Sequence, residues 1–208
     1  MFDRSLQKLI QKPLSYIGKI LIKFLSADHL TIFGFFIGIL MSISIFFELY
    51  LYALLFLIIN RLCDGLDGVM ARMTAPSPLG AYLDITLDFI IYSSFVLAFG
   101  LQDQSNLIVS VFLLFSYICT GTTFLAQAAL QPQIDKSSEE GTNEEIHKSF
   151  IYASGLIEGA ETIVFMIITL IIPQAFIFLG LVFGVLCLIT AISRIFIFYK
   201  KYKNYIPK

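Results

Sequence analysis

Long apolar stretches, separated by short polar breaks, recur along most of the chain. A bilayer core about 30 Å thick requires roughly 20 predominantly apolar residues in a helix. The pattern therefore predicts an all-α, polytopic membrane protein. The six transmembrane helices that we expect are 30–48, 50–71, 80–101, 106–130, 149–172 and 175–199.

The first 25 residues differ from the rest, because lysines are interleaved with the apolar residues. Over 5–25 the apolar residues follow helical spacing and the lysines lie on other faces, with a kink expected at Pro13. We expect an N-terminal cytoplasmic interfacial amphipathic helix that binds anionic headgroups; the alternative is a helix packed on a soluble partner. The predicted organisation is one membrane domain over 1–208. Its parts are an interfacial helix at 1–27, a six-helix core at 28–199 and a basic cytoplasmic tail at 200–208.

Composition and charge support this assignment and add an orientation. Hydrophobic residues make up 58% of the chain and charged residues only 14%, which is more apolar than a soluble core requires. Lys and Arg occupy both ends of the chain, Arg72 and the 131–148 loop, whereas the breaks near Glu48, Asp103 and Pro173 contain none. The positive-inside rule therefore predicts a multi-pass inner-membrane protein with both termini cytoplasmic and an even number of spans. The three isolated cysteines predict neither a disulfide framework nor a zinc site.

Four aspartates occupy the cytoplasmic ends of the second and third predicted spans. Asp64 and Asp67 stand at i and i+3, and Asp84 and Asp88 at i and i+4, so each pair projects from one helix face. The 73–79 turn joins the two spans as an antiparallel hairpin, which brings the pairs to a similar depth. Carboxylates within a membrane are costly and indicate a functional site.

A cluster of four carboxylates requires cations, because mutual repulsion and desolvation otherwise prevent all four from staying ionised. All-oxygen ligands favour Mg²⁺, Mn²⁺ or Ca²⁺ over zinc. Two such ions a few Å apart serve displacement at phosphorus. Gly65, Gly68 and Ala71 leave one side of the second span open to a ligand; the alternative is a small-residue helix-packing face.

The segment 64–88 resembles the signature of the CDP-alcohol phosphotransferase family, DxxDGxxAR followed by GxxxDxxxD. Seven residues separate Arg72 from Gly80, where the usual pattern has eight, but this change lies in the turn and leaves both carboxylate pairs intact. In the first span, Thr31 and Gly34 match a Thr-x-x-Gly stretch that relatives carry near the nucleotide, although the accompanying Asn is absent. The signature positions present are Asp64, Asp67, Gly68, Ala71, Arg72, Gly80, Asp84 and Asp88.

The resemblance implies an enzyme of phospholipid synthesis that uses two divalent cations, Mg²⁺ or Mn²⁺. The four aspartates would bind these ions, and Asp88 would also act as general base toward the acceptor hydroxyl, which attacks the β-phosphorus of a CDP-linked donor with release of CMP. The expected donor is CDP-diacylglycerol, which enters from the membrane, and the acceptor is an alcohol that the sequence leaves open. The nucleotide-binding residues that the resemblance implies are Gly68, Ala71, Arg72, Thr31 and Gly80.

Five further charged residues are candidates for binding the acceptor. Arg61 either pairs with the acid cluster or binds an acceptor phosphate, and Lys148 and Arg194 either contact phosphate or extend to lipid headgroups. Glu158 and Glu161 are expected two turns inside the fifth span. There they either line the acceptor pocket or pair with Arg61 or Arg194.

Two other functions remain open. The same chemistry can use a different CDP-alcohol donor, and a small cation transporter also places acids within the membrane. A transporter predicts acids spread along a path through the bilayer, whereas these four gather at one end of a hairpin. The partners that we expect are a CDP-alcohol, an alcohol acceptor and the lipid bilayer, with no nucleic acid; a homodimer is an alternative to a monomer.

Overall fold

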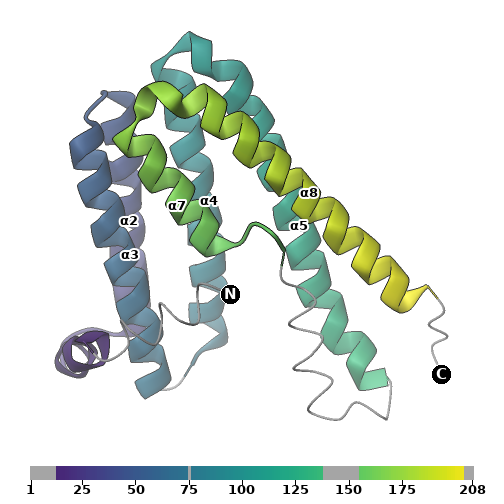
Figure 1. Ribbon diagram of the computed structural model, residues 1–208. Helices are drawn as coiled ribbons and strands as arrows, with labels where there is room; N and C mark the ends of the chain where they lie inside the picture. The colour runs from purple at the N-terminus through teal and green to yellow at the C-terminus, as the bar shows by residue number, and fades with distance from the viewer. Residues whose placement is uncertain (1–12, 75, 138–154, 204–208) are drawn as a thin grey trace.

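The structure is a computed structural model that describes residues 13–74, 76–137 and 155–203, and these residues form helices and connecting turns without a strand. Figure 1 shows a bundle in which α5 and α8 lie side by side and lean away from the other helices at one end. Helix α2 packs against α3 and α4, and α7 packs against α3. The helices are α2 (Ala27–Phe46), α3 (Tyr50–Met73), α4 (Pro78–Gln102), α5 (Leu107–Ser137), α7 (Gly159–Ile171) and α8 (Phe176–Tyr202).

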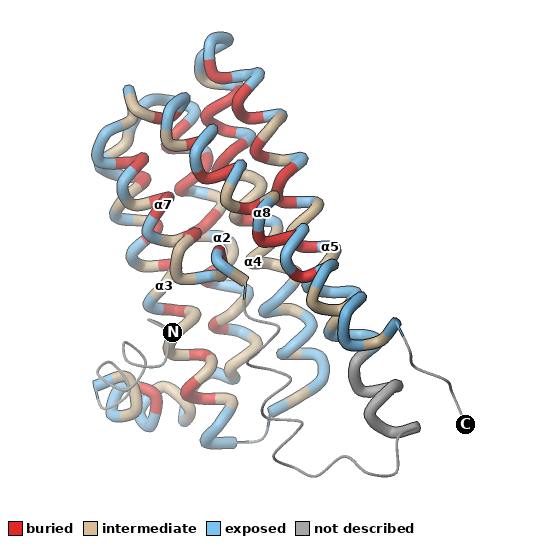
Figure 2. Tube along the Cα trace, turned by 45° about the vertical axis from the view of Figure 1, so that its right-hand side comes forward, coloured by how far each residue is buried: buried red, intermediate tan, exposed pale blue. Residues whose placement is uncertain are grey.

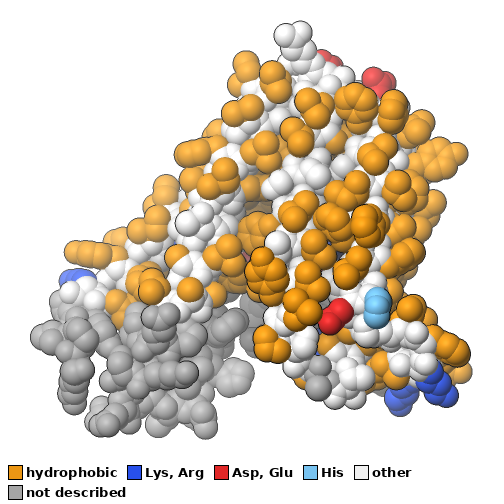
Figure 3. Space-filling view, turned by 180° about the vertical axis from the view of Figure 1, so that it is seen from behind, with side chains coloured by type: hydrophobic (Ala, Val, Ile, Leu, Met, Phe, Trp, Pro, Cys, Tyr) orange, Lys and Arg blue, Asp and Glu red, His pale blue; other side chains and the backbone are white. Residues whose placement is uncertain are grey.

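Four segments are long and apolar enough to cross a membrane: Ala27–Phe46, Pro78–Gln102, Gln104–Leu130 and Pro173–Tyr202. Helix α3 has 24 residues but carries the polar signature, and α7 has only 13 residues. The all-helical, multi-pass prediction is confirmed, whereas these criteria do not confirm six spans. In the view of Figure 3, hydrophobic side chains cover most of the visible surface and Lys and Arg side chains lie near one end, as expected of a protein surrounded by lipid.

The predicted fifth span, 149–172, is wrong over its described beginning. Residues 155–158 are not helical, and α7 starts at Gly159 with Glu158 as its N-cap residue. The N-terminal helix also ends earlier than predicted, since residues 13–21 are helical and a turn follows. Ser26 then caps the start of α2 by accepting a hydrogen bond of 3.3 Å from the His29 amide. Residues 5–12 of that predicted helix and 204–208 of the tail lie outside the described residues.

Stacked aromatic rings fill the end of the bundle away from the four aspartates. Phe99 of α4 stacks on Phe176 of α8 at 4.4 Å between ring centroids, and Phe165 of α7 stacks on Phe183 at 4.3 Å. Figure 2 shows that buried residues are concentrated in this half of the molecule. The core therefore anchors α4, α7 and α8 at one end and leaves their other ends to form a site.

Close packing of α2 on α3 sets the position of α3, the first helix of the hairpin that carries the aspartates. At Gly34 a Cβ atom would lie 2.9 Å from Cβ of Cys63, so only glycine fits without displacement. Buried Asn60 donates a hydrogen bond of 2.8 Å to the Gly34 carbonyl oxygen. This crossing fixes the register between the two helices one turn from the aspartates.

Candidate active site

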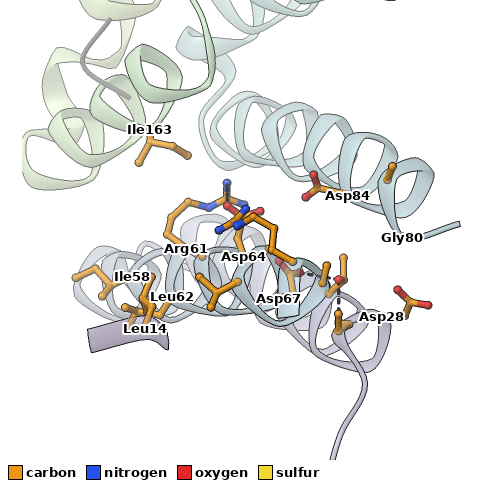
Figure 4. Close-up of a pocket in the computed structure, with 18 of the residues that line it drawn as sticks. Leu14, Asp28, Ile58, Arg61, Leu62, Asp64, Asp67, Gly80, Asp84 and Ile163 are labelled. Carbon is orange, nitrogen blue, oxygen red and sulfur yellow. Dashed lines mark hydrogen bonds and ion pairs between the residues drawn. The ribbon is translucent and has the colours of Figure 1, made fainter. Parts of the chain in front are cut away.

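A cavity of about 550 Å³ lies between α2, α3, α4 and α7, beside the helix at residues 13–21. One side carries Asp64, Asp67 and Asp84, and Figure 4 shows Asp84 of α4 across the cavity from the two aspartates of α3. A smaller cavity adjoins it, shares these three carboxylates and is also lined by Asp88. The structure therefore places the two predicted carboxylate pairs at one site. The other side of the main cavity is apolar and contains Leu57, Ile58, Leu62, Ile163 and Ile167.

Asp67 is held from α2. The hydroxyl of Thr31 donates a hydrogen bond of 2.6 Å to Asp67 Oδ2, and Asp67 is only 6% exposed. A hydrogen bond to a buried carboxylate fixes its orientation and offsets part of the cost of burying the charge. Thr31, predicted to lie near the nucleotide, thus lines the cavity and also positions an aspartate.

Asp88 is held by two donors from α3 and α4. Arg61 forms an ion pair with Asp88, with Nη2 2.7 Å from Oδ1, and its Nη1 donates a hydrogen bond of 3.3 Å to Oδ2. The hydroxyl of Tyr92 also donates to Oδ2, at 2.9 Å. The guanidinium also lies 3.6 Å from Asp64. Of the two roles predicted for Arg61, the structure therefore favours pairing with the acids. Sequence reasoning missed Tyr92, although its i+4 spacing from Asp88 places both on one helix face.

The described residues contain no group of three or more His, Cys, Asp or Glu side chains close enough together to hold a metal ion. The chemistry of the donor set nevertheless fits one, because four carboxylates from two facing helices line adjoining cavities and supply only oxygen ligands. Arg61 lies between Asp64 and Asp88 in this structure and supplies the compensating positive charge.

The residues implied for nucleotide binding surround the same cavity. Gly68, Ala71, Gly80 and Arg72 all line it, and the guanidinium of Arg72 lies against Gly68, 3.5 Å from where a Cβ would stand. Asp28 lines it as well, with Oδ1 2.9 Å from the corresponding position at Gly80. Sequence reasoning assigned no function to this aspartate, and its place just before Thr31 is the signal that points to the cavity.

Apart from Arg61, the predicted acceptor residues that are described do not line the cavities of the four aspartates. Arg194 is 7% exposed and donates hydrogen bonds of 3.1 and 3.3 Å to the carbonyl oxygen and hydroxyl of Thr120, so it does not extend to headgroups. Glu161 accepts a 3.0 Å hydrogen bond from the Glu158 amide at the start of α7, not two turns inside a span as predicted. The predicted pairing of Glu158 with Arg61 or Arg194 stays a prediction. Lys148 lies outside the described residues.

The fold and the site define a helical membrane protein in which carboxylates of two helices face each other across a cavity, as expected of an integral membrane enzyme. The CDP-alcohol phosphatidyltransferase family model matches residues 24–196, and the chain belongs to this family of phosphotransferases. The match covers the described helices from the start of α2 into α8.

Relatives and a solved structure agree with this assignment. Inner membrane protein YnjF of Escherichia coli K12 is 38% identical over 208 residues, 98% of each chain. Archaetidylinositol phosphate synthase of Pyrococcus horikoshii is 36% identical over 81 residues, 38% of this chain and 43% of that protein. The crystal structure of Mycobacterium tuberculosis phosphatidylinositol phosphate synthase (PgsA1) with CDP-DAG bound has a TM-score of 0.63 and 19% identity, covering 89% of this chain and 93% of that one, and shows the same fold.

Proposed function

We propose that the protein transfers a phosphatidyl group from CDP-diacylglycerol to an alcohol and releases CMP. The observation that carries the proposal is that both carboxylate pairs of the signature, from α3 and α4, line two adjoining cavities. A solved structure with the same fold is described with CDP-DAG bound, which supports this donor.

The apolar side of the cavity favours a lipid-linked donor over a soluble CDP-alcohol. Ile58 and Leu62 of α3 are exposed, and Ile163 and Ile167 of α7 face them across the cavity. Such a surface matches acyl chains that enter from the bilayer, whereas a soluble CDP-alcohol would leave it facing water, at a cost of about 25 cal/mol per Å² of apolar area. The donor's polar headgroup then lies toward the aspartates, and its chains lie between α3 and α7.

Two divalent cations, Mg²⁺ or Mn²⁺, fit the proposed site and would be held by Asp64, Asp67, Asp84 and Asp88. When bound, they would polarise the phosphate and stabilise the leaving oxygen. The chain's own residues then divide the remaining work. Asp88 takes the proton from the acceptor hydroxyl, Thr31 orients Asp67, and Arg72 binds the nucleotide beside Gly68 and Ala71.

We further propose a single membrane domain over 1–208 in the inner membrane, with six spans, an interfacial N-terminal helix and both termini cytoplasmic. The 24 residues of α3 extend about 36 Å, enough to cross a bilayer core despite their polar end. A relative that matches over 98% of its length is called an inner membrane protein. The helix at 13–21 exposes Tyr16, Ile17 and Ile20 beside Lys19, as an interfacial helix requires. For the acceptor, Lys148, Glu158, Glu161 and Arg194 remain candidates.

The test is CMP release by the purified protein with CDP-diacylglycerol, Mn²⁺ or Mg²⁺, and a panel of alcohols that includes glycerol 3-phosphate. We expect release with at least one alcohol, loss of release after chelation of the metal, and recovery on adding Mn²⁺. Asp88→Asn should lower the rate at least about 100-fold, because a positioned general base contributes at least that much.

The matched control is Asp103→Asn, an exposed aspartate between α4 and α5 that is remote from the cavity. This variant should keep full activity. Absence of CMP release with every alcohol would show that the proposed function is wrong. Wild-type activity in Asp88→Asn would show that Asp88 is not the general base.

A further inference from the structure

The two oxygens of Asp88 are not equivalent. Oδ2 accepts two hydrogen bonds, from the Tyr92 hydroxyl at 2.9 Å and from Nη1 of Arg61 at 3.3 Å. Oδ1 accepts one, from Nη2 of Arg61 at 2.7 Å. A carboxylate oxygen has two lone-pair positions, so in this structure Oδ2 is fully occupied and Oδ1 retains one open position. A cation bound to Asp88 would take the place of one of the Arg61 contacts.

The groups that hold Asp88 are themselves fixed. Nε of Arg61 donates to Asn60 Oδ1 at 2.8 Å, and the amide of Asn60 donates to the Gly34 carbonyl oxygen at 2.8 Å. Asp88 is therefore tied through α3 to the backbone of α2. The Tyr92 ring lies beneath the guanidinium, with 5.8 Å from its centroid to Cζ of Arg61, and its hydroxyl lies close to Gly159 at the start of α7. Such a chain of hydrogen bonds restricts the carboxylate to one orientation.

We propose that Tyr92 is a positioning residue of the transfer reaction, which occupies one position on Oδ2 of Asp88 and thereby directs Oδ1 toward the proton of the acceptor hydroxyl. This inference rests on the proposed function. In that step the O–H bond of the acceptor breaks and its proton passes to Oδ1. The acceptor oxygen forms a bond to the β-phosphorus of the donor, and CMP leaves with the electron pair of the broken P–O bond.

A free aspartate rotates between equivalent orientations, and only some of them present a lone pair to the acceptor. Removing the Tyr92 hydroxyl removes one hydrogen bond to Oδ2 and lets the carboxylate of Asp88 rotate more freely, without changing any charge. Because the donor's nucleotide and acyl chains contact other parts of the cavity, its binding should be unaffected. The effect is therefore expected in kcat and not in the KM for the donor.

The kinetic test compares Tyr92→Phe with Tyr117→Phe, in the presence of Mn²⁺, CDP-diacylglycerol and the alcohol that gives CMP release. Tyr117 of α5 is a matched control, because its hydroxyl is buried and has no hydrogen-bond partner among the described residues. We expect Tyr92→Phe to lower kcat about tenfold or more with the donor KM within about twofold of wild type. Tyr117→Phe should leave both values unchanged.

A second test needs no activity. Melting temperatures of the wild type, Tyr92→Phe, Asp88→Ala and the double variant form a double-mutant cycle. We expect non-additive shifts, since the loss of the hydroxyl matters only while the carboxylate is present. The same cycle with Tyr117→Phe should be additive.

The outcomes separate this inference from the proposed function. An active wild type with unchanged kcat in Tyr92→Phe overturns the positioning role and leaves the proposed function standing. An additive Tyr92–Asp88 cycle overturns the contact itself. A wild type that releases no CMP overturns the proposed function and, with it, the role of Tyr92 in that reaction.

Discussion

Thr31 gives a direct test of how a single residue orients the site. Its hydroxyl is 2.6 Å from Oδ2 of Asp67, the one fully buried aspartate of the four. Thr31→Val keeps the shape of the side chain and removes the donor. Because a hydrogen bond to a charged group contributes about 1.5–3 kcal/mol, we expect roughly tenfold weaker binding of Mn²⁺, measured by electron paramagnetic resonance of the free ion.

Thr31→Ser is the matched control for this measurement. It restores the hydroxyl and loses only a methyl group, so Mn²⁺ binding should stay within about twofold of wild type. Wild-type Mn²⁺ affinity in Thr31→Val, or an equal loss of affinity in both variants, would show that the hydrogen bond alone does not set Mn²⁺ binding at Asp67.

The sequence predicted which residues form the acid cluster but not how each one is held. The spacing of Asp64 and Asp67 within one helix follows from helix geometry alone. The contact between Arg61 and Asp88 does not, because it joins two helices and depends on their relative rotation. Tyr92 illustrates the same limit: its position on the face of Asp88 was predictable, whereas the 2.9 Å distance to Oδ2 was not.

At the level of helices, apolar length predicted α2 and α4 to within a few residues. The prediction failed at the start of α7, because hydrophobicity averaged over a long segment does not show where a helix is interrupted by a few residues. Gly155 lies against Thr190 and Arg194 of α8, where any side chain would clash, and the Glu161 side chain caps the first turn of α7. The first is a tertiary contact and the second a helix cap, and neither can be predicted from the hydropathy of the segment.

The crossing of α2 and α3 should couple stability to activity. Gly34→Ala would place a Cβ 2.9 Å from Cβ of Cys63, which cannot move without the backbone of α3. We expect the two helices to separate slightly, which lowers the melting temperature and weakens the Thr31–Asp67 hydrogen bond one turn away. The expected loss of kcat is about tenfold, measured by CMP release.

Gly184→Ala is the control for this prediction, because it strains a different helix pair. A Cβ there would lie 2.6 Å from the ring of Phe112 in α5, far along the bundle from the aspartates. We expect a lower melting temperature and an unchanged kcat. If Gly34→Ala and Gly184→Ala lower kcat to the same extent, the α2–α3 crossing has no special role in positioning the site.

For the whole molecule, the number of helices that cross the membrane decides on which side the site lies. Helix α3 is the critical one, because its polar end excludes it from the segments that qualify on composition. With six spans and a cytoplasmic N-terminus, the α3–α4 turn is cytoplasmic and the α4–α5 turn lies outside. If α3 and α7 do not cross, these two turns exchange sides.

Cysteine labelling at these turns distinguishes the two arrangements. Pro76→Cys and Asp103→Cys each introduce an exposed thiol, on opposite ends of α4. A membrane-impermeant maleimide should label Asp103→Cys in intact cells and Pro76→Cys only after permeabilisation, with the parent protein as control for its own three cysteines, two of them buried. The opposite pattern would mean that α3 does not span. The aspartate site would then face away from the cytoplasm, where the nucleotide donor and the released CMP are expected, so the same result would count against the proposed reaction.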